Sequence, residues 1–132
     1  MIVVDSSALI AILSNEEDAI HYATVISEAD SLLISAATFL ETSIIMLNRY
    51  GVKSIRKVNA LIEEAGFQIE DVTVRQAQLA IDAYTHYGKG RKSTSGLNYG
   101  DCFSYALAKA TGLPLLFKGR DFSGTDVEPA LH

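Results

Sequence analysis

The sequence predicts an α/β fold in which a mostly parallel central sheet is flanked by helices on both faces. Short apolar segments rich in β-branched residues alternate with longer segments whose apolar residues recur at every third or fourth position. Strand signals that alternate with helix signals are typical of βαβ units and of parallel sheets. Glycines and capping residues stand at many of the boundaries, and these residues predict where the helices begin and end.

The first half of the chain carries clear signals for both kinds of element. Ser6 or Ser7 is expected to cap the first helix, and Ser35 the third. Ser14 and Glu17 have the spacing of a capping box for the second helix. The predicted strands of this half are residues 2–4 and 32–34, and the predicted helices are residues 8–13, 19–30, 36–50 and 54–65.

The second half continues the alternation. Thr73 and Gln76 have capping-box spacing, and Asn98 is expected to cap the last helix. The predicted strands are residues 67–72 and 115–117, the predicted helices are residues 74–84 and 99–111, and a locally basic loop joins these helices over residues 88–97. Glycines are expected to stop three of the helices of the chain, at Gly51, Gly66 and Gly112.

The bulk composition fits one compact domain over residues 1–132. With 48% hydrophobic residues, the chain is expected to bury roughly two-thirds of its unfolded surface. A formal net charge of -5 argues against a broad nucleic-acid-binding surface, although a local basic patch remains compatible with it. Cys102, the lone cysteine, excludes an intramolecular disulfide and indicates a reducing compartment, the cytoplasm. No apolar run approaches the ~18 residues that span a bilayer, so neither signal peptide nor anchor is expected.

Asp5 follows directly after the first predicted strand. In open α/β sheets the ligand crevice lies outside the carboxyl ends of the strands, so an acid at this point is placed for a cation or a phosphate-bearing substrate. The alternative is that Asp5 is a turn or N-cap residue.

Glu41 is the least expected acid of the sequence. Its neighbours one helical turn away include Ala37 and Ile45, so it shares a largely apolar face rather than the solvated face expected for Arg49. A charged residue on an apolar face is costly unless it is paired or binds a metal. The alternative is a salt bridge to an arginine or lysine.

Asp101 has capping-box spacing from Asn98, and an acid in the first turn of a helix also offsets the helix dipole. That role alone accounts for its presence. The positions of Asp5, Glu41 and Asp101 nevertheless allow all three to reach one rim of a parallel sheet. Asp121, just past the last strand, is placed to reach the same rim.

Carboxylates that converge at ~4 Å repel by roughly 4 kcal/mol per pair at an effective dielectric near 20, so such a cluster needs a cation to stay ionised. All-oxygen ligands favour Mg²⁺ or Mn²⁺, which suits phosphodiester hydrolysis by a metal-activated water. Zinc is disfavoured, because the histidines lie far apart in the sequence. Ser6 is a candidate to orient that water, with helix capping as the alternative. The three histidines are His21, His86 and His132.

Four segments form an ordered pattern along nearly the whole chain: residues 3–9 (VVDSSAL), 37–42 (ATFLET), 97–108 (LNYGDCFSYALA) and 115–122 (LLFKGRDF). Together these segments resemble the PIN-domain nucleases, in particular the VapC-type toxins of bacterial toxin–antitoxin pairs. The resemblance implies a Mg²⁺-dependent or Mn²⁺-dependent endoribonuclease in which Asp5, Glu41 and Asp101 form the shared acidic site. It further implies that Asp5 and Asp101 are the principal metal ligands.

One position departs from the family pattern. Many relatives carry an acid two places before the aspartate–phenylalanine pair that follows the last strand, and here that place is Gly119. The fourth acid of the site is therefore Asp121 or Asp126, with Asp121 preferred.

The resemblance also implies partners. It implies a homodimer, a VapB-type antitoxin whose tail occupies the acidic groove with an arginine among the carboxylates, and a structured RNA substrate, commonly tRNA. A local patch is expected to hold the RNA, and Tyr99 is placed to stack on a splayed base. The alternative is an ordinary solvated loop. The basic residues of this predicted patch are Lys89, Arg91, Lys92 and Arg120.

Two other interpretations compete with the nuclease. A receiver domain that accepts a phosphoryl group is also α/β and has a lysine after its last strand, as Lys118 stands here. That class needs an acidic pair near the first strand, however, whereas serines follow Asp5, and Asp71 lies within a strand-like run. The second is a catalytically inactive module that only binds a partner, against which the intact acids argue.

Overall fold

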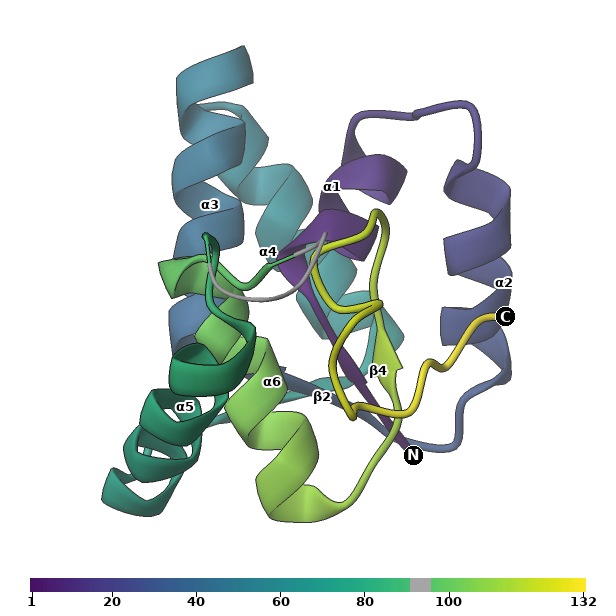
Figure 1. The fold of residues 1–132 in the computed structure, drawn as a ribbon. Coiled ribbons are helices and arrows are strands. Elements are labelled where there is room, and N and C mark those ends of the chain that lie inside the picture. The colour runs from purple at the N-terminus through teal and green to yellow at the C-terminus, as the bar shows by residue number, and fades with distance from the viewer. Residues whose placement is uncertain (91–95) are drawn as a thin grey trace.

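The computed structural model describes residues 1–90 and 96–132, and its centre is a parallel sheet (Figure 1). The strands are β1 (Ile2–Val4), β2 (Leu32–Ser35), β3 (Phe67–Glu70) and β4 (Leu115–Leu116), in the order β3-β2-β1-β4. Each neighbouring pair is parallel, and Val3 of β1 lies opposite Leu33 on one side and Leu115 on the other. The predicted α/β class and the parallel sheet are confirmed. Strand β1 is internal, so the residue that follows it leaves the middle of the sheet.

Helices follow the strands as the sequence predicts. Asn98 forms the predicted capping box with Asp101, while Ser35 and Thr73 accept backbone hydrogen bonds at the starts of their helices. Gly51 directly follows α3 and Gly66 directly follows α4. The helices are α1 (Ser6–Leu13), α2 (Ala19–Glu28), α3 (Ala36–Tyr50), α4 (Ser54–Ala65), α5 (Val74–Tyr87) and α6 (Tyr99–Thr111).

Two of the predicted caps are wrong. The first helix starts at Ser6, and its cap is Asp5, whose side chain accepts a hydrogen bond from the Ser7 backbone N–H. Ser14 does not open the second helix, because it is the C-terminal cap of α1 and its N–H bonds to the carbonyl of Ile10. Helix α2 begins one turn later, after Asp18, which makes no side-chain capping bond.

Different helices cover the two faces of the sheet. Side chains alternate along β1, so its residues point to the two faces in turn. Ile2 and Val4 face one hydrophobic cluster, to which α1, α2, α3 and α4 contribute. Val3 faces a second cluster built by α5, α6 and residues after β4. Cys102 is buried in this second cluster, as its apolar neighbours predict. Among the helices described, none combines the length and the apolar character required to cross a lipid bilayer.

Candidate active site

Asp5 directly follows strand β1 and is almost completely buried. Its carboxylate accepts hydrogen bonds from two hydroxyl groups. One carboxylate oxygen accepts hydrogen bonds from the Ser7 N–H (3.1 Å) and the Ser7 hydroxyl (2.7 Å). The other oxygen accepts one from the Ser104 hydroxyl (2.5 Å). Burial raises the pKa of Asp5, and the hydrogen bonds from Ser104 and Ser7 oppose that rise. Asp5 is thus both the N-cap of α1 and a rigidly held acid at the carboxyl end of the sheet.

Ser104 and Thr38 form a buried hydroxyl pair behind Asp5. The two hydroxyl oxygens lie 3.1 Å apart, and both residues are within 1% of full burial. Ser104 of α6 thereby links Thr38 of α3 to Asp5, the acid that directly follows β1. Our sequence analysis missed this pair, although the spacing of Asp101 and Ser104, three residues apart on one helix face, was a usable signal.

Glu41 lies in the middle of α3 with its carboxylate against Gly100 of α6. A Cβ atom on Gly100 would stand only 2.8 Å from the Glu41 Cδ, so the glycine makes room for the acid. Burial raises the pKa of Glu41, a side-chain hydrogen bond with Ser6 lowers it, and the charge of Asp5 raises it. The ion pairs within the described residues do not include Glu41, which argues against the salt-bridge alternative.

Asp101 has both of the roles considered for it. Its carboxylate accepts the Asn98 N–H (2.9 Å) and its own N–H bonds to the Asn98 side chain (2.9 Å), which completes the capping box. Burial, together with the charges of Asp5 and Asp121 and a hydrogen bond with Asp121, raises the pKa of Asp101 to about 8, against the lowering effect of Asn98. The capping acid is therefore also a member of a cluster of facing carboxylates.

The two candidates for the fourth acid lie in different places. Asp121 lines the same hollow as Asp101, and its charge contributes to the raised pKa of Asp101. Asp126 instead accepts hydrogen bonds from the Tyr105 hydroxyl (2.6 Å) and the Lys109 ammonium (2.9 Å). The geometry therefore favours Asp121, and Asp126 is a structural ion-pair residue.

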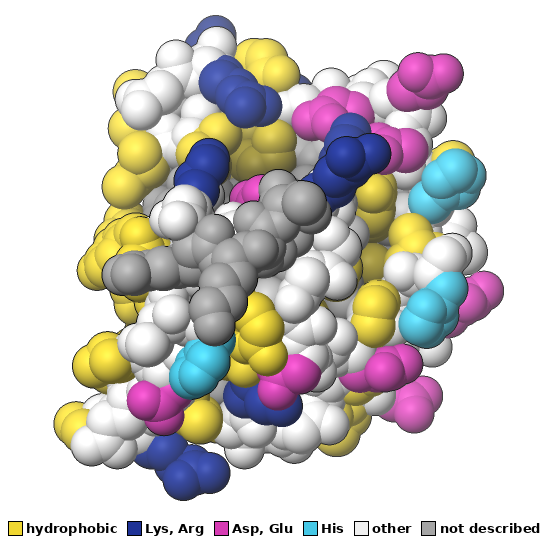
Figure 2. Space-filling model, in the orientation of Figure 1, with side chains coloured by type: hydrophobic (Ala, Val, Ile, Leu, Met, Phe, Trp, Pro, Cys, Tyr) yellow, Lys and Arg dark blue, Asp and Glu magenta, His cyan; other side chains and the backbone are white. Residues whose placement is uncertain are grey.

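These acids line a hollow of about 360 Å³ at the carboxyl end of the sheet, which we call the acidic hollow. In the view of Figure 2, several Lys and Arg side chains lie in the upper part of the molecule, with Asp and Glu side chains beside them at the upper right. Arg49 lines the hollow with Glu41, contrary to our expectation, because positions 41, 45 and 49 are one or two turns apart on the same face of α3. The residues lining it are Asp5, Ser6, Ser7, Ile10, Glu16, Glu41, Ile45, Arg49, Asn98, Asp101, Lys118 and Asp121.

Lys118 is one of the residues that line the acidic hollow. Its ammonium group pairs with Glu16 and with Asp18 (2.9 Å), and these hydrogen bonds raise its pKa. Its backbone N–H donates to the Ser7 hydroxyl (2.9 Å), which in turn donates to Asp5. Because two acids of the α1–α2 connection hold the ammonium group, Lys118 does not occupy the place that a receiver-domain lysine takes beside its phosphoacceptor. Our sequence analysis missed this cluster, whose members lie about a hundred residues apart.

The donor set of the acidic hollow fits a hard divalent cation. Its acidic side chains offer carboxylate oxygens, and three of them have raised pKa values. Within residues 1–90 and 96–132, however, no three acidic, histidine or cysteine side chains form a ready cage for a metal ion. None of the histidines, His21, His86 and His132, lines the hollow.

Of the remaining predicted site residues, the structure places only some at the acidic hollow. Ser6 lines the acidic hollow with Glu41, so it is placed near the acids but does not cap α1. Tyr99 is 79% exposed, packs edge-on against Phe103 with ring centroids 5.0 Å apart, and lines a second hollow with Glu41. Lys89 and Arg120 are exposed and are not among the lining residues of the acidic hollow. The predictions for Arg91 and Lys92 fall outside the described residues.

Comparison with known proteins identifies the family. The PIN domain model matches residues 2–128. Ribonuclease VapC28 of Mycobacterium tuberculosis is 48% identical over 129 residues, which cover 98% of this chain and 97% of the relative. The fold is similar to that of Mycobacterium tuberculosis VapC20, a sarcin–ricin loop cleaving toxin, with a TM-score of 0.78 and 18% identity over 96% of each chain. It is also similar to a chain of a toxin–antitoxin complex from Klebsiella pneumoniae, with a TM-score of 0.72 and 18% identity over 96% of this chain and 93% of that one. This chain belongs to the PIN-domain family, among the VapC ribonucleases.

Proposed function

We propose that this chain is a toxin that hydrolyses phosphodiester bonds in structured RNA with the help of a divalent cation, Mg²⁺ or Mn²⁺. The observation that carries the proposal is the convergence of Asp5, Glu41, Asp101 and Asp121 on one hollow from four separate segments. Membership of the VapC ribonucleases supports the reaction class. The proposed catalytic residues are these four acids, with Asp5 and Asp101 as principal ligands of the cation and Glu41 as a further one.

The chain's own residues prepare the site in three ways. Ser7 and Ser104 fix both oxygens of Asp5, so the carboxylate keeps one orientation. Burial and the charges of Asp5 and Asp121 raise the pKa of Asp101 to about 8, so the free site favours the protonated form of this acid near neutral pH. Ser6, next to Glu41, is placed to orient a water. When bound, the cation lowers the pKa of a coordinated water and offsets charge on the phosphate.

We further propose the substrate and partners that the family resemblance implied. The substrate is a structured RNA, with tRNA as the expected class and a sarcin–ricin loop as the competitor suggested by VapC20. The partner is a VapB-type antitoxin whose tail enters the acidic hollow with an arginine, which is supported by the fold's likeness to a toxin–antitoxin complex. The toxin is proposed to act as a homodimer in the cytoplasm.

Cleavage should depend on a divalent cation. Purified protein is expected to cut end-labelled RNA in Mn²⁺ or Mg²⁺, to stop in excess chelator, and to resume when Mn²⁺ is restored. Parallel reactions on total tRNA and on a sarcin–ricin loop oligonucleotide separate the two substrate classes by their cleavage products. If neither RNA is cut and calorimetry detects no Mn²⁺ binding, the chain is an inactive binding module and the proposal fails.

Gly100→Ala is expected to reduce cleavage at least about 10-fold without destabilising the fold, on the scale of losses caused by misplacing a group next to a metal ligand. The new methyl group would collide with the Glu41 carboxylate, which is the flexible end of its side chain and must move away. Gly100 lies in the first turn of α6, where alanine by itself favours the helix by up to about 1 kcal/mol.

The measurement for this variant is the cleavage rate at saturating Mn²⁺, together with the thermal midpoint. Gly112→Ala is not a suitable control, because its φ of 71° strains any side chain. Ala110→Gly, near the other end of α6, tests whether a change in helix propensity alone alters the rate. Wild-type cleavage by Gly100→Ala would show that the position of Glu41 does not matter for the reaction.

A further inference from the structure

A second feature of the molecule is a concentration of positive charge that the acidic hollow does not explain. Four of the eleven lysines and arginines of the chain lie within residues 49–57, which contain no acid, and we call this stretch the basic segment. The ion pairs among the described residues use Lys109, Lys118 and His132, so the basic segment makes none. Its cations are Arg49, Lys53, Arg56 and Lys57.

Local folding does not account for these cations. Three of them stand at the start of α4, where Lys53 is the N-cap residue and makes no side-chain capping bond. A cation in the first turn of a helix opposes the helix dipole by about 0.3–1 kcal/mol. The arrangement therefore costs stability in the free protein, and an anionic ligand would offset that cost.

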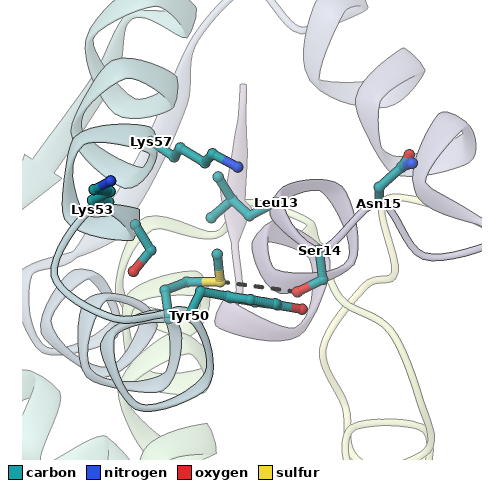
Figure 3. Close-up of a pocket in the computed structure, with 8 residues that line it drawn as sticks. Leu13, Ser14, Asn15, Tyr50, Lys53 and Lys57 are labelled. Carbon is teal, nitrogen blue, oxygen red and sulfur yellow. Dashed lines mark hydrogen bonds between the residues drawn. The ribbon is translucent and has the colours of Figure 1, made fainter.

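The basic segment borders a hollow of about 300 Å³ between α1, α3 and α4, which we call the lysine hollow. Leu13, Met46 and Tyr50 give it an apolar lining, and Lys53 and Lys57 line it from α4. Figure 3 shows Lys57 extending toward Leu13 and the Tyr50 side chain extending toward Ser14, whose hydroxyl lies 4.0 Å from the Met46 sulfur. Tyr50 is 54% exposed, so its ring is open to a ligand.

The lysine hollow continues from the acidic hollow along the same two helices. On α3, Arg49 lines the acidic hollow and the next residue, Tyr50, lines the lysine hollow. On α1, Ile10 belongs to the first hollow and Leu13 to the second, roughly 5 Å further along the helix axis. The two hollows are therefore neighbours along α1 and α3, within the reach of one extended chain molecule.

We propose that the lysine hollow is a subsite for the RNA strand next to the phosphate that is cleaved. Arg49, Lys53 and Lys57 bind successive phosphates of the strand, and the Tyr50 ring stacks on an unpaired base. An apolar lining also suits a protein segment, but unpaired cations, an exposed aromatic ring and continuity with the proposed cleavage site together match single-stranded RNA. This subsite rests on the proposed function, which supplies the cleavage site that it extends.

The test measures RNA binding separately from cleavage. Binding of a single-stranded RNA of about ten nucleotides is followed by fluorescence anisotropy at several salt concentrations, in an Asp101→Asn background that is expected not to cut it. Lys53→Gln/Lys57→Gln is expected to lower the slope of log affinity against log salt by about 1.4, because each phosphate contact on a single strand contributes about 0.7. Arg75→Gln, a matched cation in the first turn of α5, is expected to leave the slope unchanged.

Substitution of Tyr50 is expected to change RNA binding in a different way from loss of the two lysines. Tyr50→Ala is expected to weaken RNA binding about 5-fold to 150-fold with little change in the salt slope, since stacking of one base does not involve counterion release. Tyr50→Phe keeps the ring and is expected to restore affinity to the wild-type level. Equal losses in Tyr50→Phe and Tyr50→Ala would mean that the ring does not stack on a base.

The remaining outcomes separate this subsite from the proposed function and from a protein-binding site. If the native protein cuts RNA but Lys53→Gln/Lys57→Gln binds it with an unchanged slope, the subsite is wrong and the nuclease stands. If RNA is bound with the expected slope change but never cut, the subsite stands and the nuclease is wrong. If poly-L-glutamate binds through Lys53 and Lys57 while RNA binding ignores them, the lysine hollow serves an acidic polypeptide and the proposal is overturned.

Discussion

Asp5→Asn and Asp101→Asn are each expected to abolish RNA cleavage, with a loss of at least about 100-fold. Removal of a residue that only supports a metal ligand typically costs 10-fold to 100-fold in metal affinity or activity, so loss of a ligand itself should cost at least that much. Each substitution removes one negative charge from the acidic hollow and replaces a carboxylate oxygen by an amide nitrogen, which cannot bind a cation.

Both variants are expected to fold, because local hydrogen bonding can adapt. In Asp101→Asn, the new side chain would keep an oxygen that accepts the Asn98 N–H, so the capping box survives. In Asp5→Asn, the amide nitrogen would face the Ser104 hydroxyl, which can accept that bond and donate to Thr38 instead, since either member of the hydroxyl pair can be the donor. Above about pH 8, where the clustered acids are ionised, loss of one buried charge should raise the thermal midpoint of the metal-free protein.

The matched control is Asp126→Asn. Asp126 is an acid outside the acidic hollow, bound to Tyr105 and Lys109, so its substitution should leave the cleavage rate near the wild-type value. Asp121→Asn should resemble Asp101→Asn, which decides the identity of the fourth acid. Cleavage rates and Mn²⁺ binding isotherms are the measurements. Full activity of Asp5→Asn or Asp101→Asn, or inactivity of Asp126→Asn alone, would contradict the assignment of the site.

The stability of the metal-free protein is expected to fall as the pH rises from about 5 to about 8. The pKa of Asp101 is raised from 3.8 to about 8 in the folded state, so in this range the folded chain holds a proton that the unfolded chain has lost. Stability decreases with pH wherever the folded state binds more protons, by about 1.4 kcal/mol per pH unit for one proton. The raised pKa values of Asp5 and Glu41 act in the same direction. Asp18, whose pKa is lowered by its hydrogen bond with Lys118, contributes only at lower pH.

Divalent cations should reverse this trend, because Mg²⁺ or Mn²⁺ replaces the proton and binds the ionised cluster more tightly at higher pH. Urea unfolding at several pH values, with chelator or with Mn²⁺, measures the effect. Asp101→Asn should flatten the pH dependence in chelator, whereas Asp126→Asn should leave it in place. A metal-free stability that rises between pH 5 and pH 8 would show that the acids are not held close together.

The prediction of the fold depended on signals that are local in the chain. Apolar runs, capping residues such as Ser35 and Asn98, and the glycines after the helices each act within a few residues, so the order of strands and helices could be read directly. The wrong caps at Ser6 or Ser7 and at Ser14 show the limit of such signals. Several polar residues stand in a row there, and packing decides which of them ends one helix or begins the next.

The candidate site likewise contains acids that local signals predicted and one acid that they left undecided. Asp5 and Asp101 were found because a strand end and a helix start place them at one edge of a parallel sheet. The choice between Asp121 and Asp126 depended on which part of α6 each acid faces, because Asp121 lies near Asp101 at the start of the helix whereas Asp126 bonds to Tyr105 and Lys109 further along. No periodic pattern reports that.

The sequence by itself determined the α/β class, the order of the elements and the acids at the ends of those elements, because these features follow from neighbouring residues. Only the tertiary structure decided that Ser104 holds Asp5, that Gly100 makes room for Glu41, and that Lys118 is neutralised by Glu16 and Asp18. The physical reason is that these contacts join residues 59 to 102 positions apart, so they depend on how helices pack across the sheet.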